Sequence, residues 1–219
     1  MIKDKIIDQI AVQGILPMYI NSDLEVMKQT ALLCSEAGLK TLEVLNRVPD
    51  ALEIFIELKD FIDKNIPGFM LSAGTITDVK TAKKFIDAGA SMIIAPNLNE
   101  EVGRLCIENN IEWLPGVFTI SEFYKAKSIG ATGFKLFPAN LVSPDIVNIV
   151  KTLLPETKVI ASGGIRLKGD SIPNWINAGA DAIAIGNGFF TEDILSGGVF
   201  KYMKNKLLET VEQINTIRN

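Results

Sequence analysis

Histidine is absent from the 219 residues, and its absence excludes several kinds of site. A Ser-His-Asp or Cys-His nucleophile, a histidine general base and a histidine-ligated metal site all need an imidazole. Cysteine is almost as scarce, since Cys34 and Cys106 are the two present and no C-x-x-C spacing occurs. We expect both to be reduced packing residues of a cytosolic chain.

Long apolar runs and an excess of positive charge are also lacking. No stretch reaches the ~18 uninterrupted apolar residues that a membrane-spanning helix requires. Charged residues interrupt the N-terminal sequence M-I-K-D-K-I-I-D-Q-I, so we expect neither a signal peptide nor a transit peptide. With a net charge of −4, the chain has no obvious source of the counterion-release attraction to nucleic acid. We therefore expect a cytoplasmic protein without membrane or nucleic-acid partners.

The sequence does contain a regular alternation of two kinds of segment. Short β-branched runs alternate with longer amphipathic stretches, and the strand candidates begin 20 to 27 residues apart. Each interval leaves room for one helix and two short loops. Ser22 with Glu25 and Thr119 with Glu122 match the capping box that begins a helix. The candidate strands cover residues 14–20, 41–46, 68–74, 91–96, 111–117, 133–138, 158–164 and 182–188.

These repeated units predict a compact (β/α)8 barrel, with its site at the C-terminal ends of the strands. A short helix precedes the first strand, and no linker divides the chain, so we expect a single domain over residues 1–219. Residues 85–96 resemble residues 175–186, as repeated units of a barrel would. The alternative is an open doubly wound sheet, although no G-x-G-x-x-G sequence follows the first strand.

Lys135 is the one lysine inside an apolar strand candidate, the sequence G-F-K-L-F-P at residues 133–138. Side chains alternate along a strand, so Lys135 and Phe137 share the face opposite to Phe134 and Leu136. If that face is the barrel interior, the amine loses its hydration, which favours the neutral form that attacks a carbonyl carbon. The alternatives are a lysine that extends out of the barrel mouth and a lysine in a structural ion pair.

Glu43 is placed in the same way in the second candidate strand, between Leu42 and Val44, which we expect to face outward. A carboxylate is rarely buried without a partner or a function. Glu43 is either the ion-pair partner of a basic residue or, with Lys135, a proton shuttle beside a nucleophilic amine. Arg47 follows this strand, where a guanidinium suits the binding of a substrate carboxylate; a solvated surface arginine is the alternative.

Small residues and glycines follow other candidate strands. The sequence Ser72-Ala-Gly-Thr75 ends the third strand with a hydroxyl and suits close approach of a substrate, although a helix-capping turn would look the same. Gly163 and Gly164 follow the seventh strand, and Gly186-Asn-Gly188 follows the eighth, where free backbone amides commonly bind phosphate. Arg166 would add positive charge beside the first pair. Tight turns alone are the alternative.

Taken in chain order, these segments resemble a known family. The segments are T-L-E-V-L-N-R, S-A-G-T, I-A-P-N, L-P-G-V-F-T-I-S-E, F-K-L-F-P-A and S-G-G-I. Across nearly the whole chain they resemble the 2-keto-3-deoxy-6-phosphogluconate (KDPG) aldolase and 4-hydroxy-2-oxoglutarate aldolase family. The resemblance implies a (β/α)8 barrel, usually a homotrimer, and a class I aldolase, a lyase that forms a Schiff base with its 2-keto acid substrate and uses no metal or other cofactor.

The resemblance also implies roles for individual residues. Lys135 is similar to the Schiff-base lysine of the family and Glu43 to its general acid/base. Arg47 and Thr75 are similar to the residues that hold the pyruvate carboxylate. The remaining implied positions are the apolar wall beside the lysine, Pro96 and Phe137, and the amide donors to the substrate phosphate, Gly163 and Gly164.

Two features depart from the family pattern. Gly188 stands where the phosphogluconate-type enzymes commonly carry a phosphate-binding serine, and the longer loop after S-G-G-I contains Arg166 and Lys168. Pro96-Asn97 resembles the related galactonate-type aldolases, so the stereochemistry of the substrate stays open. The expected reaction is reversible cleavage of a 2-keto-4-hydroxy acid to pyruvate and either glyceraldehyde 3-phosphate or glyoxylate. The alternatives are another phosphate-binding barrel enzyme, such as an epimerase or a thiamine-phosphate synthase relative, and a non-catalytic phosphosugar-binding protein.

Overall fold

Strands and helices alternate along the chain in the order that the sequence predicts. The computed structural model describes residues 5–165, 167, 171–186 and 189–218. Within these residues the strands are β1 (Ile15–Tyr19), β2 (Thr41–Leu45), β3 (Met70–Gly74), β4 (Met92–Ile94), β5 (Glu112–Leu114), β6 (Gly116–Val117), β7 (Gly133–Leu136), β8 (Lys158–Ala161) and β9 (Ala182–Ile185).

The helices lie between the strands and at both ends of the described chain. They are α1 (Ile6–Gln13), α2 (Leu24–Glu36), α3 (Ala51–Asn65), α4 (Val79–Asp87), α5 (Glu100–Glu108), α6 (Ile120–Ile129), α7 (Asp145–Leu153), α8 (Ser171–Asn177) and α9 (Gly197–Arg218), with 3₁₀ turns η1 (Ala139–Leu141) and η2 (Glu192–Leu195). Among the described residues, no helix combines the length and the apolar character that a membrane crossing requires.

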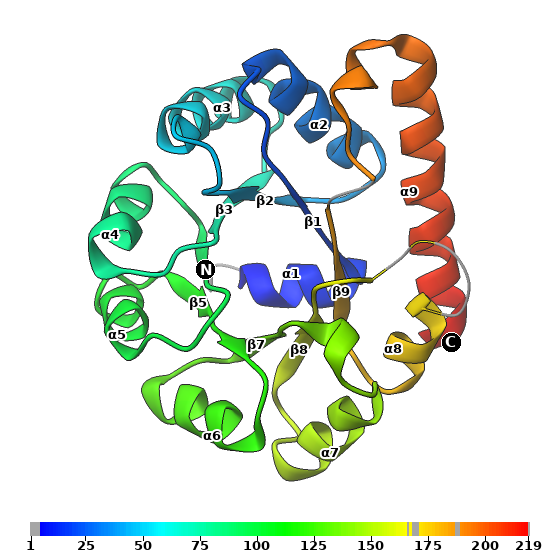
Figure 1. Cartoon of the computed structure of the whole chain (residues 1–219). Coiled ribbons are helices and arrows are strands. Elements are labelled where there is room, and N and C mark those ends of the chain that lie inside the picture. The colour runs from blue at the N-terminus through cyan, green and yellow to red at the C-terminus, as the bar shows by residue number, and fades with distance from the viewer. Residues whose placement is uncertain (1–4, 166, 168–170, 187–188, 219) are drawn as a thin grey trace.

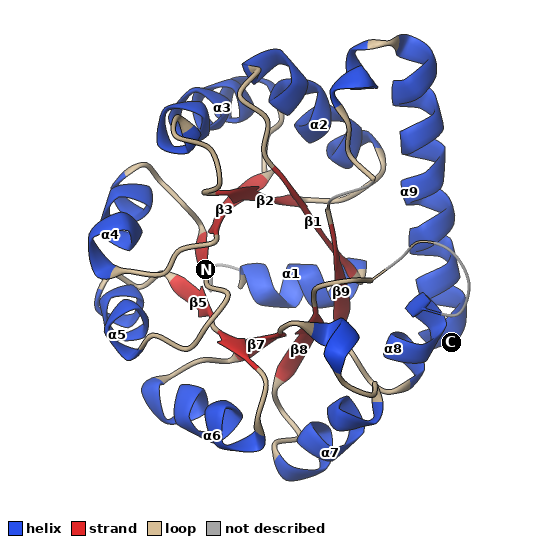
Figure 2. Ribbon diagram, viewed as in Figure 1, coloured by secondary structure: helices blue, strands red, loops and turns tan. Residues whose placement is uncertain are grey.

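All strands belong to one parallel sheet that closes on itself. The strand order is β5-β4-β3-β2-β1-β9-β8-β7-β6, in which β1 pairs with β9. The strands at the two ends of this order, β5 and β6, are consecutive halves of the run 112–117. Figures 1 and 2 show the strands as an inner ring with helices α2 to α9 outside it. The predicted (β/α)8 barrel is therefore confirmed, and the open doubly wound sheet is excluded.

Proline divides the fifth predicted strand, 111–117, so that the described sheet has nine strands where the sequence predicts eight. Pro115 has no amide hydrogen to donate to a neighbouring strand, and the ladder changes partner there. The Leu114 carbonyl accepts a hydrogen bond from the Ala95 amide (3.1 Å), whereas the Pro115 carbonyl accepts from the Lys135 amide (2.9 Å). The run 112–117 thus joins β4 on one side to β7 on the other.

Several predicted strands extend too far toward their C-terminal ends. The predicted strand 158–164 ends as β8 at Ala161. Gly163 and Gly164 have φ angles of 95° and 71°, which lie outside the range of an extended strand. The predicted strand 182–188 ends as β9 at Ile185. The described residues after the last ladder bond form loops at the barrel mouth, where a pattern of small and apolar residues looks like a strand.

One predicted capping box is confirmed and the other is wrong. The Thr119 hydroxyl and the Glu122 carboxylate each accept from the other residue's backbone amide at the start of α6. At the start of α2, the carboxylate of Asp23 accepts from the Glu25 amide (2.8 Å). Ser22 instead donates its hydroxyl to a carboxylate on the neighbouring loop (3.0 Å). A carboxylate one residue later takes the capping position that the pattern assigned to the serine.

The alternation of side chains along the strands divides the apolar residues into two cores. The outer core lies between strands and helices and includes Leu42, Val44, Leu71, Ala73, Phe134 and Leu136. The inner core fills the barrel and includes Leu16, Met92, Ile94, Leu114, Ile160, Ala182 and Ala184. Charged side chains that alternate with the outer set therefore enter the barrel.

Helix α1 closes the N-terminal end of the barrel. It crosses the ring in Figure 1, and Ile6, Ile7 and Ile10 belong to the inner core. The amides of Ile6 and Ile7 donate to the two carboxylate oxygens of Glu112, at 2.8 and 3.0 Å, so the first residue of β5 caps this helix. Gly133 begins β7 beside it, and a Cβ there would lie 2.6 Å from Ile7. Within the described residues this helix fills the N-terminal end of the barrel, so a substrate is expected at the C-terminal end.

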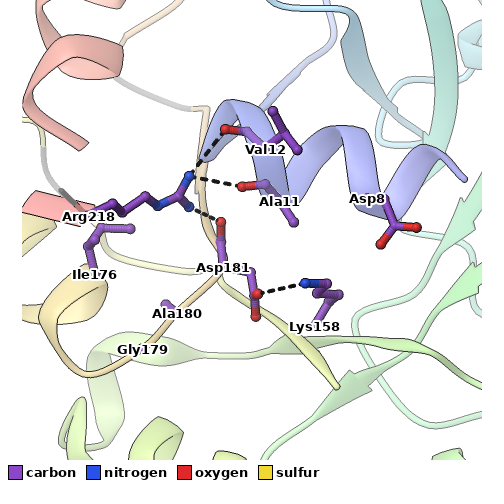
Figure 3. A pocket seen from close by; sticks show the side chains of 9 residues that line it. All are labelled: Asp8, Ala11, Val12, Lys158, Ile176, Gly179, Ala180, Asp181 and Arg218. Atoms are coloured by element: carbon purple, nitrogen blue, oxygen red, sulfur yellow. Dashed lines mark hydrogen bonds and ion pairs between the residues drawn. The ribbon is translucent and has the colours of Figure 1, made fainter. Parts of the chain in front are cut away.

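Arg218, at the end of α9, ties the last helix to α1. Its guanidinium donates to the carbonyls of Ala11 (3.0 Å) and Val12 (3.2 Å), and also to the carbonyl of Asp181. Figure 3 shows these bonds beside a pocket of about 390 Å³, in which the Asp181 carboxylate pairs with Lys158 at 3.4 Å. This pocket lies at the N-terminal ends of the strands, where barrel residues serve stability.

Candidate active site

Lys135 of β7 and Glu43 of β2 meet inside the barrel. Their neighbours along the strands belong to the outer core, so both side chains point inward. The Lys135 Nζ donates to Oε1 of Glu43 at 3.0 Å. The exposed fractions are 3% for the lysine and 0% for the glutamate. The structure thus places an amine and a carboxylate in contact in an interior from which water is largely excluded.

The second carboxylate oxygen of Glu43 has no partner. Among the described residues, no donor lies within hydrogen-bond distance of this buried Oε2 atom. A carboxylate has about four lone-pair sites, so the contact with Lys135 leaves accepting capacity unused. A carboxylate in this state is able to take up a proton from a bound molecule.

Gly74, on the neighbouring strand β3, makes room for the Glu43 carboxylate. A Cβ at this position would lie 2.1 Å from Oε1 and 2.6 Å from Cγ of Glu43. Its φ angle is not among the positive ones, so it is space rather than backbone conformation that the glycine supplies. The sequence predicts this glycine at the end of the third strand, where it suits close approach of a substrate, and it is the last residue of β3. A glycine inside a strand is itself a signal of close approach by another group.

Phe137 and Pro96 lie next to the segments that carry the lysine. The ring centroid of Phe137 is 5.9 Å from the Lys135 Nζ. The backbone of Pro96 packs against Gly116, the register partner of Lys135 on β6, where a Cβ would lie 2.2 Å from the Pro96 carbonyl carbon. Both residues predicted to form an apolar wall are therefore close to the strand segments around Lys135.

Arg47 and Thr75 are joined at the mouth of the barrel. They follow β2 and β3, which are neighbours in the sheet, and the Arg47 Nε donates to the Thr75 hydroxyl at 2.9 Å. This bond uses one of the five N–H donors of the exposed guanidinium. The remaining N–H donors can bind a carboxylate. Thr75 has a φ of 60°, an unfavourable conformation for a β-branched residue and one that is found most often at functional sites.

Gly163 and Gly164 present two backbone amides in the loop after β8. Within the described residues, neither amide has a hydrogen-bond acceptor. The loop is held from the side of η1, because the Asn140 amide donates to the Gly163 carbonyl at 3.1 Å. Free amides at the C-terminal ends of barrel strands are suited to an anion. Gly188, Arg166 and Lys168, which the sequence analysis adds to this region, lie outside the described residues.

Two buried serine hydroxyls lie in segments predicted to belong to the site, but the sequence assigned neither of them a role of its own. Ser72 and Ser162 are both fully buried, and in the described part of the chain neither hydroxyl has a hydrogen-bond partner. Ser72 alternates with Leu71 and Ala73 of the outer core, so it faces the barrel interior. The signal was present in the sequence as a serine at an inward position of an otherwise apolar strand.

The two thiols of the described residues, Cys34 and Cys106, are both buried. Burial raises the pKa of the Cys34 thiol, and it raises the pKa of Cys106 to about 12, so neither thiol provides a thiolate near neutral pH. In the part of the chain that the structure describes, no three carboxylates or thiols are grouped so as to hold a metal ion.

Comparison with known proteins is consistent across sequence and structure. A family model described as "Aldolase: KDPG and KHG aldolase" matches residues 6–204. The chain is 25% identical over 165 residues to a probable 2-dehydro-3-deoxy-6-phosphogalactonate aldolase of Rhizobium meliloti, which covers 75% of this chain and 76% of the relative. It is 26% identical over 152 residues to the 2-dehydro-3-deoxy-phosphogluconate aldolase of Zymomonas mobilis, covering 69% and 71%. The crystal structure of KDPG aldolase from Legionella pneumophila, with pyruvate captured as a covalent carbinolamine intermediate, matches with a TM-score of 0.80 and 21% identity, covering 93% of this chain and 97% of the other.

Proposed function

Because the chain belongs to the KDPG and KHG aldolase family, we propose that it cleaves a 2-keto-3-deoxy-6-phospho sugar acid or 4-hydroxy-2-oxoglutarate through a Schiff base on Lys135. The products are pyruvate and an aldehyde, which is glyceraldehyde 3-phosphate in the first case and glyoxylate in the second. The enzyme is a lyase. The observation that carries the residue assignment is the buried contact of 3.0 Å between Lys135 and Glu43. The match to this family favours an aldolase over the epimerase, thiamine-phosphate synthase and non-catalytic alternatives.

The first steps attach the substrate to the enzyme. Glu43 accepts a proton from the Lys135 ammonium, and the neutral amine attacks the C2 carbonyl carbon to form a carbinolamine. Loss of water, with a proton supplied by Glu43, gives an iminium. The captured carbinolamine in the Legionella pneumophila enzyme supports this order of events.

The iminium then serves as an electron sink for cleavage. The C4 hydroxyl gives its proton to Glu43, the C3–C4 bond breaks, and its electron pair forms the C2–C3 double bond of an enamine while the aldehyde leaves. Reprotonation at C3 and hydrolysis of the imine release pyruvate and restore Lys135. The free Oε2 of Glu43 supports this role, because it leaves the carboxylate an accepting position while Oε1 contacts the lysine.

The ends of the substrate are assigned to the groups at the barrel mouth. Arg47 and Thr75 bind the carboxylate of the pyruvate part, which their mutual hydrogen bond of 2.9 Å supports. Pro96 and Phe137 form the apolar wall. The phosphate binds to the amides of Gly163 and Gly164, with further contributions from Gly188 and Arg166, which lie outside the described residues.

The proposal extends to the state of the protein in the cell: a single-domain chain that assembles as a cytoplasmic homotrimer. Family resemblance is the main support for the trimer. Exposed apolar side chains on neighbouring outer elements, Tyr124 of α6 and Ile149 and Leu153 of α7, provide surface of the kind that subunit contacts cover.

Trapping of the imine tests the chemistry and the identity of the lysine together. Incubation with pyruvate and borohydride should add one three-carbon unit, and peptide mass spectrometry should locate it at Lys135. Lys127→Ala, a change on the exposed surface of α6, should be labelled like the wild type, whereas Lys135→Ala should be neither labelled nor active. Labelling of another lysine, or an active wild type that is not labelled, would overturn the Schiff-base assignment.

A further inference from the structure

Ser72 occupies the strand position next to Glu43. The two residues are register partners on β3 and β2, and both face the barrel interior. On its other side, Ser72 is in register with Met92 of β4, an apolar residue of the inner core. Register partners on adjacent strands lie about 4.8 Å apart, so the serine and the glutamate side chains start from neighbouring points on the same wall.

The Ser72 hydroxyl is not explained by packing. The residue is 0% exposed, and its Oγ has no hydrogen-bond partner among the described residues. Burial of an unpaired hydroxyl destabilises a protein, and alanine would fill nearly the same volume without this cost. The neighbouring Glu43 has an unpaired oxygen as well. A donor without an acceptor and an acceptor without a donor therefore lie side by side.

The reaction changes which donor the Glu43 carboxylate has. In the free enzyme, Oε1 contacts the Lys135 ammonium at 3.0 Å. An ammonium carries three N–H donors, whereas the nitrogen of an iminium carries one and the nitrogen of a carbinolamine is occupied by two carbon atoms. Formation of the imine thus leaves Lys135 with fewer N–H groups that can donate to this carboxylate. Because Gly74 has no Cβ, the carboxylate lies directly against the β3 backbone, the strand that also carries Ser72.

We propose, on the basis of the function proposed above, that Ser72 is a positioning residue that donates its hydroxyl hydrogen bond to the Glu43 carboxylate once Lys135 has formed the imine. The serine then holds the carboxylate against the substrate for proton transfer at C3 and C4. Ser162 is not equivalent, because it follows β8 beyond Ile160, the register partner of Lys135, and so lies nearer the mouth.

Deuterium exchange at C3 of pyruvate reports the proton transfer that Ser72 is proposed to assist. Imine formation on Lys135, which Ser72 is not proposed to assist, is measured separately. With pyruvate alone, the imine forms, the C3–H bond breaks with its electron pair forming the enamine, and Glu43 takes the proton. Return of a deuteron from D2O labels the methyl group of pyruvate, which proton NMR detects. Borohydride trapping measures imine formation in the same mixture.

Ser72→Ala should keep the rate of trapping at Lys135 within about 2-fold of wild type. Its rate of methyl exchange and its kcat should fall by about 10-fold or more with little change in KM, the effect expected for loss of one hydrogen bond to a charged group. Ser72→Thr, which keeps the hydroxyl, should restore exchange. Thr30→Val is the matched control, since it removes a buried hydroxyl from α2, outside the barrel, where it donates to the Val26 carbonyl.

Exchange in Ser72→Ala within about 2-fold of wild type would overturn the proposal, since loss of one hydrogen bond to a charged group should lower the rate by more than about 2-fold. An equal fall in the rates of trapping and exchange would also overturn it, because Ser72 would then not act specifically after the imine has formed. If Ser72→Thr does not fold, as judged by circular dichroism, the contrast between trapping and exchange in Ser72→Ala alone decides. Absence of wild-type trapping at Lys135 would instead refute the proposed function, so the two failures are distinguishable.

Discussion

The Glu43 carboxylate extends over the strand beside it, and a glycine gives it the space to do so. Gly74 lies where any side chain would meet Oε1 of the glutamate at 2.1 Å. The glycine on β6 has a similar relation to the backbone of Pro96, at 2.2 Å. At the scale of single residues, the shape of the site is therefore set by missing Cβ atoms as much as by charged groups.

Gly74→Ala should displace the Glu43 carboxylate without preventing folding. The far end of a flexible side chain has to move, and kcat should fall by about 100-fold, the low end of the effect of a lost general acid/base. Gly197→Ala is the control, because no atom lies within 4 Å of a Cβ at that position. Steady-state kinetics and urea unfolding of both variants test this prediction. Wild-type kcat in Gly74→Ala would mean that the carboxylate can work from another position.

The sequence predicts the charged residues of the site better than their surroundings. Lys135 and Glu43 stand out because each is a charge in an apolar strand, and the period of two directs both to one face. The bond between Arg47 and Thr75 joins residues 28 positions apart, and it depends on two loops that no periodicity describes. The φ of 60° at Thr75 likewise results from the loop as a whole rather than from its residue type.

At the scale of elements, α6 connects β6 to β7, the strand that carries Lys135, and the start of α6 is held by a capping box. The Glu122 carboxylate accepts from the amides of Phe118 (2.9 Å) and Thr119 (2.7 Å). Partial burial raises the pKa of Glu122, but these amide hydrogen bonds lower it further, so that on balance its pKa lies below the usual value.

Glu122→Ala should destabilise the fold by about 1 kcal/mol near neutral pH, the low end for a partly solvated cap. A lowered pKa in the folded state means that the stabilisation is present above the unfolded pKa of about 4.3 and is lost as the pH falls through the folded value. Urea unfolding of wild type and variant should therefore converge in acid. Glu108→Ala, an exposed change at the end of α5, is the control. If wild type and Glu122→Ala differ in free energy of unfolding by the same amount near neutral pH and in acid, the stabilising role of the ionised carboxylate is contradicted.

The existence of the elements is predictable, and their limits are less so. Spacings of 20 to 27 residues between strand candidates predict repeated strand and helix units, because little else fits in such an interval. The split at Pro115 was not predicted, since the sequence pattern treats 111–117 as one run, and the change of pairing partner depends on how the barrel closes. The cap of α2 at Asp23 was missed because Ser22 is an equally good capping residue in isolation.

At the scale of the whole molecule, the site exists only when distant parts of the chain are together. The Lys135–Glu43 contact spans 92 residues, and β5 and β6 separate the half that contains the glutamate from the half that contains the lysine. Trp113 lies on β5 and Trp175 lies on α8, so each half contains one tryptophan.

Activity should therefore be lost with the first unfolding transition in urea, whichever half unfolds first. Trp113→Phe and Trp175→Phe leave one fluorescent reporter in the second and the first half of the barrel, respectively. The two signals, followed with kcat in the same urea series, show which half opens and whether catalysis ends with it. If both signals change together, the barrel unfolds as one cooperative unit and activity is lost with both. Activity that persists after one half has unfolded would contradict the assignment of Glu43 and Lys135 to one site.

Helix α1, which closes the N-terminal end of the barrel, affects the order in which substrates bind and products leave. Ile6, Ile7 and Ile10 fill that end, so in the described part of the chain a substrate can reach Lys135 from the C-terminal end of the barrel. On the proposed chemistry, cleavage leaves pyruvate covalently bonded to Lys135 while the aldehyde is released from it. The aldehyde must then leave first and pyruvate last, and in the synthetic direction pyruvate must enter before the aldehyde. The order of arrival and departure is thus imposed by the architecture.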